Sequence, residues 1–220
     1  MIMKTEKLLT AGVIATPLFF AVALPQAVAR DGFDLSRHMI SQLSLGSLGF
    51  LQIANFLVTG VLFILGAIGL NRVLTEGIGH VWIPRLVAAF GAGLIAAGLF
   101  VADPVNGYPV GEPDSLSWHG ILHGAAATLS GLALVAALII LARRFIRDGR
   151  KGMAAASIAI AAAFMVLPAA LPSVVSITFA TVSFLAWGWI SLFAAAQLRH
   201  HATASTHTPA AVRTPDFELV

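Results

Sequence analysis

The sequence predicts an all-α, polytopic membrane protein, a bundle of six transmembrane helices with a short interfacial helix in the first outer loop. Hydrophobic residues make up 58% of the 220 residues and charged residues only 10%, whereas about a quarter of a soluble domain is charged. A helix needs about 20 apolar residues to cross a bilayer. Six stretches are long enough: roughly 8–29, 50–71, 82–102, 118–142, 152–171 and 174–197. Their length and continuity favour helices over strands.

The first stretch has features of both a membrane span and a secretory signal. Basic residues precede it, and residues 27–29 resemble a signal-peptidase cleavage site. The apolar run is long for a signal, however, and it contains Pro17 and Pro25. We therefore expect this stretch to be retained as the first of the six spans.

Polar and small residues in the next two stretches indicate contacts between helices. Gln52 and Asn55 lie in the outer part of the second stretch, where amide side chains hydrogen-bond to neighbouring helices or contact a ligand. The third stretch contains Gly91, Gly93 and Gly98, and small residues in a membrane helix favour close packing against another helix.

The last two stretches are separated by only a few residues around Pro172, which predicts a tight helical hairpin. After them the chain becomes rich in Thr, Ala, Pro and His. We therefore expect one six-helix transmembrane domain over residues 1–198 and a disordered cytoplasmic tail over residues 199–220.

Lysine and arginine are distributed unevenly between the two sides of the predicted membrane. With the N-terminus inside, eleven of the thirteen basic residues lie in inner segments, and only Arg30 and Arg37 lie outside. The positive-inside rule then places both termini in the cytoplasm. This asymmetry explains the net charge of +3 without a nucleic-acid partner, and the absence of cysteine excludes disulfides and thiolate chemistry.

The first outer loop, residues 30–49, carries the first of two polar clusters. Four of its polar residues recur at helical spacing: Asp34, Arg37, His38 and Ser41. This spacing predicts one face of a short amphipathic helix lying at the interface, with Asp34 as its N-cap. The helix either forms part of a functional site or only tucks between the spans.

The second outer loop leads directly to two histidines at the start of the fourth span. His119 and His123 are four residues apart, so they share one helix face. Such a pair can hold a zinc ion, with His38 as a third ligand. Asp103 or Ser41 could then activate a water for hydrolysis at the outer membrane face. The glutamate of the zinc-protease signature is missing, and the alternatives are a structural hydrogen-bond network and a ligand site without metal.

A stripe of small residues accompanies the histidine pair along the fourth span: Gly120, Gly124, Ala127 and Gly131. Small residues on one face predict tight packing against another helix. The histidine side chains would then be directed into the bundle rather than toward lipid.

Several segments resemble a known membrane family: residues 34–49, 100–104, 107–109 and 120–123. They are similar to the bacterial family catalogued as domain of unknown function 998, whose members have six spans and this polar first outer loop. The resemblance covers roughly residues 8–198 and implies a multi-pass protein of the bacterial inner (plasma) membrane. It points to these positions: Arg37, His38, Ser41, Asp103, Pro104 and His123. His119 belongs less clearly to the pattern. A looser likeness links the chain to seven-span intramembrane hydrolases of the ceramidase and adiponectin-receptor type.

The polar clusters predict a pocket on the extracytoplasmic side that binds a lipid headgroup or a small polar molecule. The candidate ligand-binding residues are Asp34, Arg37, His38, Ser41, Asp103 and His123. Arg37 would pair with a carboxylate or phosphate. One alternative is a metal-dependent intramembrane hydrolase acting on a lipid or amide, and its candidate catalytic residues are His38, Ser41, Asp103 and His123.

A structural or assembly subunit is the other alternative. Membrane lipids are the expected partners, and self-association into a homo-oligomer stays open. The sequence shows no inverted repeat and no charged residue at the centre of a span. Both observations argue against a secondary transporter or a proton pump.

Overall fold

The structure, a computed structural model, describes residues 3–206 and confirms the predicted all-α class. Six of its helices are long and apolar enough to cross a membrane. They are α1 (Thr5–Ala29), α2 (Gly49–Val73), α3 (Trp82–Leu99), α4 (Trp118–Arg147), α5 (Lys151–Ala170) and α6 (Val175–Thr206). Two short 3₁₀ helices, η1 (Ile40–Ser44) and η2 (Pro172–Val174), lie in the connections before α2 and α6.

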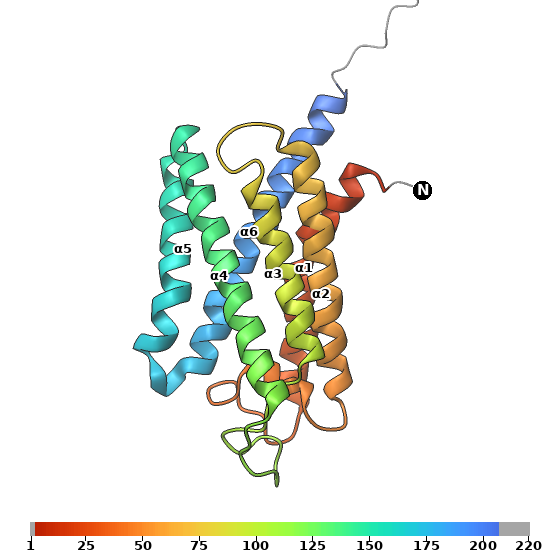
Figure 1. Cartoon of the computed structure of the whole chain (residues 1–220), viewed down its shortest axis with the longest axis vertical. Helices are drawn as coiled ribbons and strands as arrows, with labels where there is room; N and C mark the ends of the chain where they lie inside the picture. The colour runs from red at the N-terminus through yellow and green to blue at the C-terminus, as the bar shows by residue number, and fades with distance from the viewer. Residues whose placement is uncertain (1–2, 207–220) are drawn as a thin grey trace, which may run out of the picture.

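Successive helices run in opposite directions, so the connections gather at the two ends of the bundle (Figure 1). We call the end formed by residues 30–48, 100–117 and 171–174 the loop end. The opposite end carries the start of α1 and the last turns of α6, and we call it the terminal end. Both polar outer loops and the start of α4 therefore lie at the loop end.

The sixth helix continues farther than the sequence predicts. Residues 199–206 are helical, whereas the composition predicts that a disordered tail begins at residue 199. The hydroxyl of Thr203 bonds to the carbonyl oxygens of Arg199 and His200, and the alanines nearby favour a helix. The rest of the predicted tail, residues 207–220, lies outside the described residues.

Glycines bring the first three helices close together. A Cβ added to Gly12 of α1 would lie 3.1 Å from the Cα of Gly66 on α2. Likewise, a Cβ on Gly60 of α2 would crowd the carbonyl oxygen of Gly91 on α3. The prediction that glycines of the third span serve close helix packing is therefore confirmed at Gly91.

Aromatic side chains fill the centre of the bundle and join four helices. The rings of Phe63 and Phe90 meet edge to face with centroids 4.9 Å apart. Trp187 of α6 contacts Phe90 at 5.2 Å and Phe19 of α1 at 4.8 Å. In contrast, α5 lies at the edge of the bundle (Figure 1), where it packs along α4 and α6.

Buried amides link α1 to α2 near the loop end. The Gln26 amide donates to Oε1 of Gln52 at 3.1 Å, and the Asn55 amide donates to the Phe19 carbonyl at 3.0 Å. Arg30 donates to Oε1 of Gln26 at 2.7 Å, which connects this pair of helices to the first outer loop. The amides of the second span thus bond to a neighbouring helix, the first of the two roles that the sequence left open.

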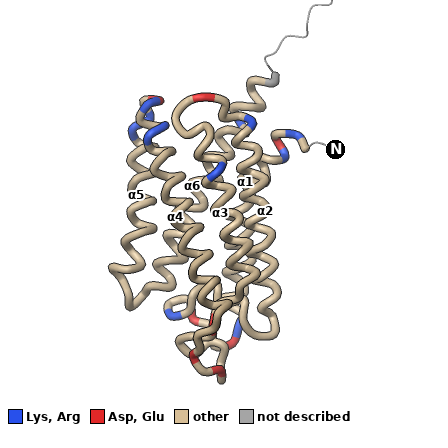
Figure 2. Tube along the Cα trace, in the orientation of Figure 1, with Lys and Arg blue, Asp and Glu red and all other residues tan. Residues whose placement is uncertain are grey.

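Charge is segregated along the bundle axis. Lys and Arg gather mostly at the terminal end, whereas the loop end carries acidic side chains on its long loops (Figure 2). This is the charge pattern that the positive-inside rule associates with a cytoplasmic terminal end.

Candidate functional site

The first outer loop forms a turn followed by η1, instead of one amphipathic helix. The Asp34 carbonyl accepts the backbone N–H groups of Arg37 and His38, and its carboxylate accepts two hydrogen bonds from Ser36. The chain then becomes extended at Met39, which ends the turn before η1 begins. The prediction of a helix that starts at Asp34 is therefore wrong, because the Asp34 side chain closes a local turn that competes with a helix.

His38 fastens the first outer loop to the second. The side chain is 3% exposed, and its Nδ1 accepts the Asp34 backbone N–H at 2.9 Å. The proton of the neutral ring therefore belongs on Nε2, which lies 3.1 Å from the Asn106 carbonyl oxygen and donates to it. The ring also contacts Phe33 and Tyr108, each with centroids 5.4 Å apart. Both ring nitrogens are thus occupied by bonds within the chain.

Two further side chains hold the same loop, and the sequence did not single them out for this role. The Gln42 amide donates to the Val105 carbonyl of the second outer loop at 2.8 Å. Arg30 donates to the carbonyls of Leu45 and Leu48, so it ties the end of α1 to the start of α2. The only indication of these contacts in the sequence is the presence of an amide, Gln42, and a guanidinium, Arg30, beside apolar residues.

Asp103 organises the start of α4. Its carboxylate accepts the Ser117 backbone N–H at 2.8 Å and the Ser117 hydroxyl at 2.5 Å. Ser117 is the N-cap of α4, and its hydroxyl oxygen accepts the Gly120 backbone N–H at 3.1 Å. A Cβ on Gly120 would collide with the Asp103 carboxylate, so glycine is required there for this approach. The negative charge also lies at the positive end of the α4 helix dipole.

The pKa values of two loop carboxyls lie below their ordinary value of 3.8. Burial raises the pKa of Asp103, but the side-chain and backbone hydrogen bonds from Ser117, with smaller contributions from His119 and His123, outweigh it. The pKa of Asp34 is lowered chiefly by the hydrogen bonds from Ser36. Both carboxylates are therefore ionised at neutral pH, and their charge serves contacts within the loops.

The two histidines of α4 bond to the end of α3. Nδ1 of His123 lies 2.8 Å from the Ala97 carbonyl oxygen and 2.9 Å from that of Phe100. Nδ1 of His119 lies 3.0 Å from the Val101 carbonyl oxygen. The last carbonyl groups of a helix have no partner within it. His123 therefore satisfies the end of the neighbouring helix, and His119 bonds to the loop just beyond it, each through Nδ1.

The structure does not gather the residues of the predicted zinc site. Within residues 3–206, no group of three or more His, Cys, Asp or Glu side chains is close enough to hold a metal ion. His38 bonds to the second outer loop, while His119 and His123 bond to the end of α3. The Asp103 carboxylate is 3.7 Å from His119, but its oxygens are already bonded to Ser117.

A cavity of about 360 Å³ lies inside the bundle toward the loop end. Its lining comes from α1 to α6 and from η1, and most of it is apolar. Phe19, Phe90 and Trp187 line it alongside Ser41 of η1 and His123 of α4. The cavity therefore combines an aromatic wall with a small number of polar groups.

The small-residue stripe of α4 faces this cavity along much of its length. A Cβ added to Gly124 would meet nothing within 4 Å, and both Gly124 and Ala127 line the cavity. Gly131 also lines it and approaches the Phe164 ring of α5. The predicted tight packing against another helix is therefore found at Gly131 and not at Gly124, which borders open space.

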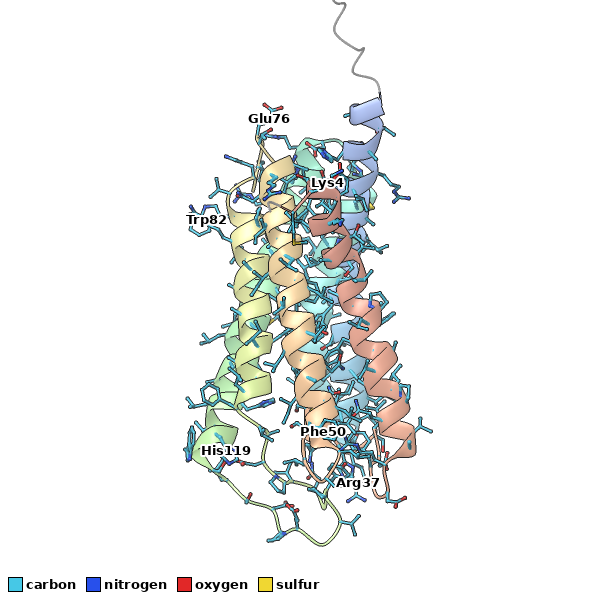
Figure 3. All side chains as sticks on the ribbon, turned by 90° about the vertical axis from the view of Figure 1, so that its right-hand side faces the viewer. Lys4, Arg37, Phe50, Glu76, Trp82 and His119 are labelled. Carbon is cyan, nitrogen blue, oxygen red and sulfur yellow. The ribbon has the colours of Figure 1, made fainter. Side chains whose placement is uncertain are left out.

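The structure brings only part of the predicted set of residues together. Ser41 and His123 line the same cavity, whereas the Pro104 carbonyl bonds within the second outer loop. Arg37 is exposed, and its guanidinium makes no hydrogen bond or ion pair to any residue that the structure describes. Figure 3 shows Arg37 and His119 on different sides of the loop end.

Six apolar helices, two interlocked polar loops and an internal cavity define a polytopic helical membrane protein. The family model described as "Protein of unknown function (DUF998)" matches residues 13–196, and the chain belongs to this family. The match covers most of the six-helix bundle and confirms the resemblance seen in the loop segments. Searches of curated proteins and of solved structures find no match for this chain.

Proposed function

We propose that this protein binds a lipid in the cavity at the loop end of its bundle. The observation that carries the proposal is the cavity itself, about 360 Å³ of largely apolar space with a few polar groups in its lining. Small-molecule sites are cavities of about 300–1,000 Å³ with this division between apolar walls and few polar groups. An apolar wall inside a membrane protein suits an amphipathic lipid better than a small polar molecule.

The lining also supports access from the bilayer. Three of its residues, Gly124 and Thr128 of α4 and Phe179 of α6, are exposed at the surface of the bundle. In a membrane that surface faces acyl chains rather than water. A lipid could thus enter sideways between α4 and α6, with its polar part inside and the rest of its chains in the bilayer.

The outer loops form the cover of the proposed site. Met39, Ile40 and Ser41 line the cavity on the loop side. His38 and Gln42, on either side of these residues, bind this segment to the second outer loop. In this proposal His38 and Asp103 hold the cover in place, and Ser41 and His123 face the lipid.

The charge distribution supports an orientation for the site. Most basic residues lie at the terminal end (Figure 2), so we place that end and both termini in the cytoplasm. The cavity then opens in the extracytoplasmic half of the plasma membrane.

A pair of glycine substitutions tests lipid binding. Gly124→Phe places a ring in the cavity, where a Cβ meets nothing within 4 Å. Gly188→Phe is the matched control, because a Cβ there is equally free but lies in a separate groove between α1 and α6. Native mass spectrometry of the full chain should show lipid retained by the wild type and by Gly188→Phe, and lost from Gly124→Phe.

Equal lipid retention by Gly124→Phe and Gly188→Phe would refute the proposed site. In that case the interlocked loops would favour the structural or assembly role that the sequence left open. We do not propose the metal-dependent hydrolase, because no group of three or more His, Cys, Asp or Glu side chains among residues 3–206 is close enough to hold a metal ion.

A further inference from the structure

Two serine hydroxyls of α6 are buried at the proposed lipid site without a partner. Ser176 is 2% exposed and Ser183 is 4% exposed, and both line the cavity. Among the described residues, neither Oγ has a hydrogen-bond partner. The two serines are seven residues apart, so they lie on one helix face and are separated by about 10 Å along the axis.

Two other hydroxyls in the same lining are already satisfied. Thr128 donates to the Gly124 carbonyl and Ser130 donates to the Ala127 carbonyl, both within α4. Serines in helices usually bond to a carbonyl one turn earlier in this way. An unpartnered buried hydroxyl is costly, so Ser176 and Ser183 are the positions at which a ligand oxygen would relieve that cost.

His123 adds an acceptor to these two donors. Both short contacts of its Nδ1 are to carbonyl oxygens, which only accept, so Nδ1 carries the proton of the neutral ring. Nε2 is then an acceptor, and it has no hydrogen-bond partner among residues 3–206. His123 lines the cavity and is 9% exposed. A hydroxyl of a ligand can donate to this nitrogen.

The lining lacks the groups that an anionic headgroup needs. None of the described residues around the cavity is Lys, Arg, Asp or Glu. A phosphate buried there would lose its hydration without a cation to replace it, which is strongly unfavourable.

We propose a ligand for this cavity, a proposal that rests on the lipid site proposed above. The ligand is an uncharged glycerolipid of the diacylglycerol class, with one free hydroxyl and two ester carbonyls. The hydroxyl donates to Nε2 of His123, and the ester carbonyls accept from Ser176 and Ser183. The apolar wall around Phe90 and Trp187 contacts the start of an acyl chain. The hydroxyl and the two ester carbonyls of the ligand thus meet groups that otherwise have no partner.

Three lipids with identical chains test this ligand class on the full-length protein by native mass spectrometry. They are dioleoylglycerol, its acetylated form, which lacks the hydroxyl, and dioleoylphosphatidic acid, which carries a phosphate. One lost hydrogen bond corresponds to about a tenfold change in affinity. Dioleoylglycerol should bind best, the acetylated form about tenfold more weakly, and the phosphatidic acid more weakly than dioleoylglycerol.

Three variants assign the polar contacts. His123→Asn keeps an amide donor for the α3 carbonyls, but its side chain is too short to place the amide oxygen where Nε2 lies, so it should weaken the preference for the free hydroxyl. The double variant Ser176→Ala/Ser183→Ala should weaken dioleoylglycerol binding at least tenfold. Because the removed hydroxyls have no partner, the lipid-free double variant should unfold at the same or a higher temperature than the wild type. Thr181→Ala, on the same helix but outside the lining, removes a hydroxyl that is already bonded to the Ile177 carbonyl, so it should leave affinity unchanged.

The results separate this inference from the proposed site. If Gly124→Phe abolishes binding but phosphatidic acid binds as tightly as dioleoylglycerol, the lipid site stands and the uncharged ligand class is overturned. Equal effects of Thr181→Ala and the double variant would also overturn it. If no lipid binding responds to Gly124→Phe, the proposed site fails together with the inference.

Discussion

Nδ1 of His123 lies 2.8 Å from the carbonyl oxygen of Ala97, across the contact between α4 and the end of α3. This bond satisfies a carbonyl that α3 itself leaves without a partner. It also fixes the ring so that Nε2 becomes the atom available to the cavity. One histidine therefore joins the packing of two helices to the chemistry of the proposed lipid site.

Replacement of His38 should loosen the contact between the two outer loops. His38→Phe preserves a ring against Phe33 and Tyr108 but removes the bonds to Asp34 and Asn106. We expect a loss of about 2 kcal/mol in the free energy of unfolding, because two partly buried hydrogen bonds are removed. Chemical unfolding in mixed micelles measures this loss.

Arg37→Ala is the control for His38→Phe. Arg37 is the preceding residue, but its side chain is exposed, so its removal should change the unfolding free energy by less than about 0.5 kcal/mol. Equal losses from the two substitutions would contradict the role assigned to His38.

Gly120 and Gly124 should respond differently to the same substitution. Gly120→Ala drives a methyl group into the Asp103 carboxylate, and we expect a cost of about 1–3 kcal/mol from this overpacking. Gly124→Ala adds a methyl group where nothing lies within 4 Å, so it should be neutral or stabilising by up to about 1 kcal/mol. Thermal unfolding of the two variants checks both signs, and a destabilised Gly124→Ala would show that its surroundings are not open.

The stabilisation from Asp103 should disappear in acid. Its folded pKa lies below the ordinary value of 3.8 because the Ser117 hydrogen bonds outweigh burial. A depressed folded pKa gives stability that is complete above the unfolded pKa and is lost as the pH falls through the folded pKa. The difference in melting temperature between wild type and Asp103→Asn should therefore be constant from pH 7 to about pH 5 and shrink below about pH 4. A difference that stays constant to pH 3 would contradict this assignment.

Two buried threonines provide a matched pair for hydrogen bonding inside the bundle. The hydroxyl of Thr16 on α1 lies 2.9 Å from that of Ser191 on α6, whereas Thr59 Oγ1 on α2 has no partner among the described residues. Thr16→Val should cost about 1 kcal/mol, while Thr59→Val should be neutral or stabilising. Unfolding free energies in the same micelles decide between these outcomes.

Single cysteines should report the orientation of the bundle. The chain contains no cysteine, so Glu112→Cys in the second outer loop and Gly149→Cys between α4 and α5 each give one thiol. A membrane-impermeant maleimide added to intact cells should label Glu112→Cys and not Gly149→Cys, because the positive-inside rule predicts a cytoplasmic location for the basic terminal end. Labelling of Gly149→Cys alone would reverse the orientation.

The six helices could be predicted because each is marked by the apolar composition of a long, continuous stretch of sequence. Apolar stretches of membrane length need no knowledge of tertiary contacts, and the predicted spans correspond to α1 to α6. The end of α6 was misplaced because a polar, threonine-containing segment can continue a helix once its hydroxyls bond to the backbone, as Thr203 does.

The site was harder to predict, because contacts between the loops decide where its polar residues lie. The spacing of residues in the sequence does not reveal those contacts. The spacing of Asp34 and His38 fits a helix, yet the Ser36 bonds to Asp34 close a turn first. The prediction did place His123 and Ser41 at the same end of the molecule, where both line the cavity. Ser176 and Ser183 carry no sequence signal, because a serine in an apolar helix usually bonds to its own backbone.

Photolabelling tests the central claim, that a lipid occupies this cavity, most directly. Dioleoylglycerol with a diazirine near the start of one chain is bound to the full-length protein, irradiated, and the labelled peptides are identified. We predict that label concentrates on residues 123–131 of α4 and 176–187 of α6, and that unlabelled dioleoylglycerol or Gly124→Phe removes it. Label spread evenly over the outward faces of the helices, and unaffected by either treatment, would contradict the account.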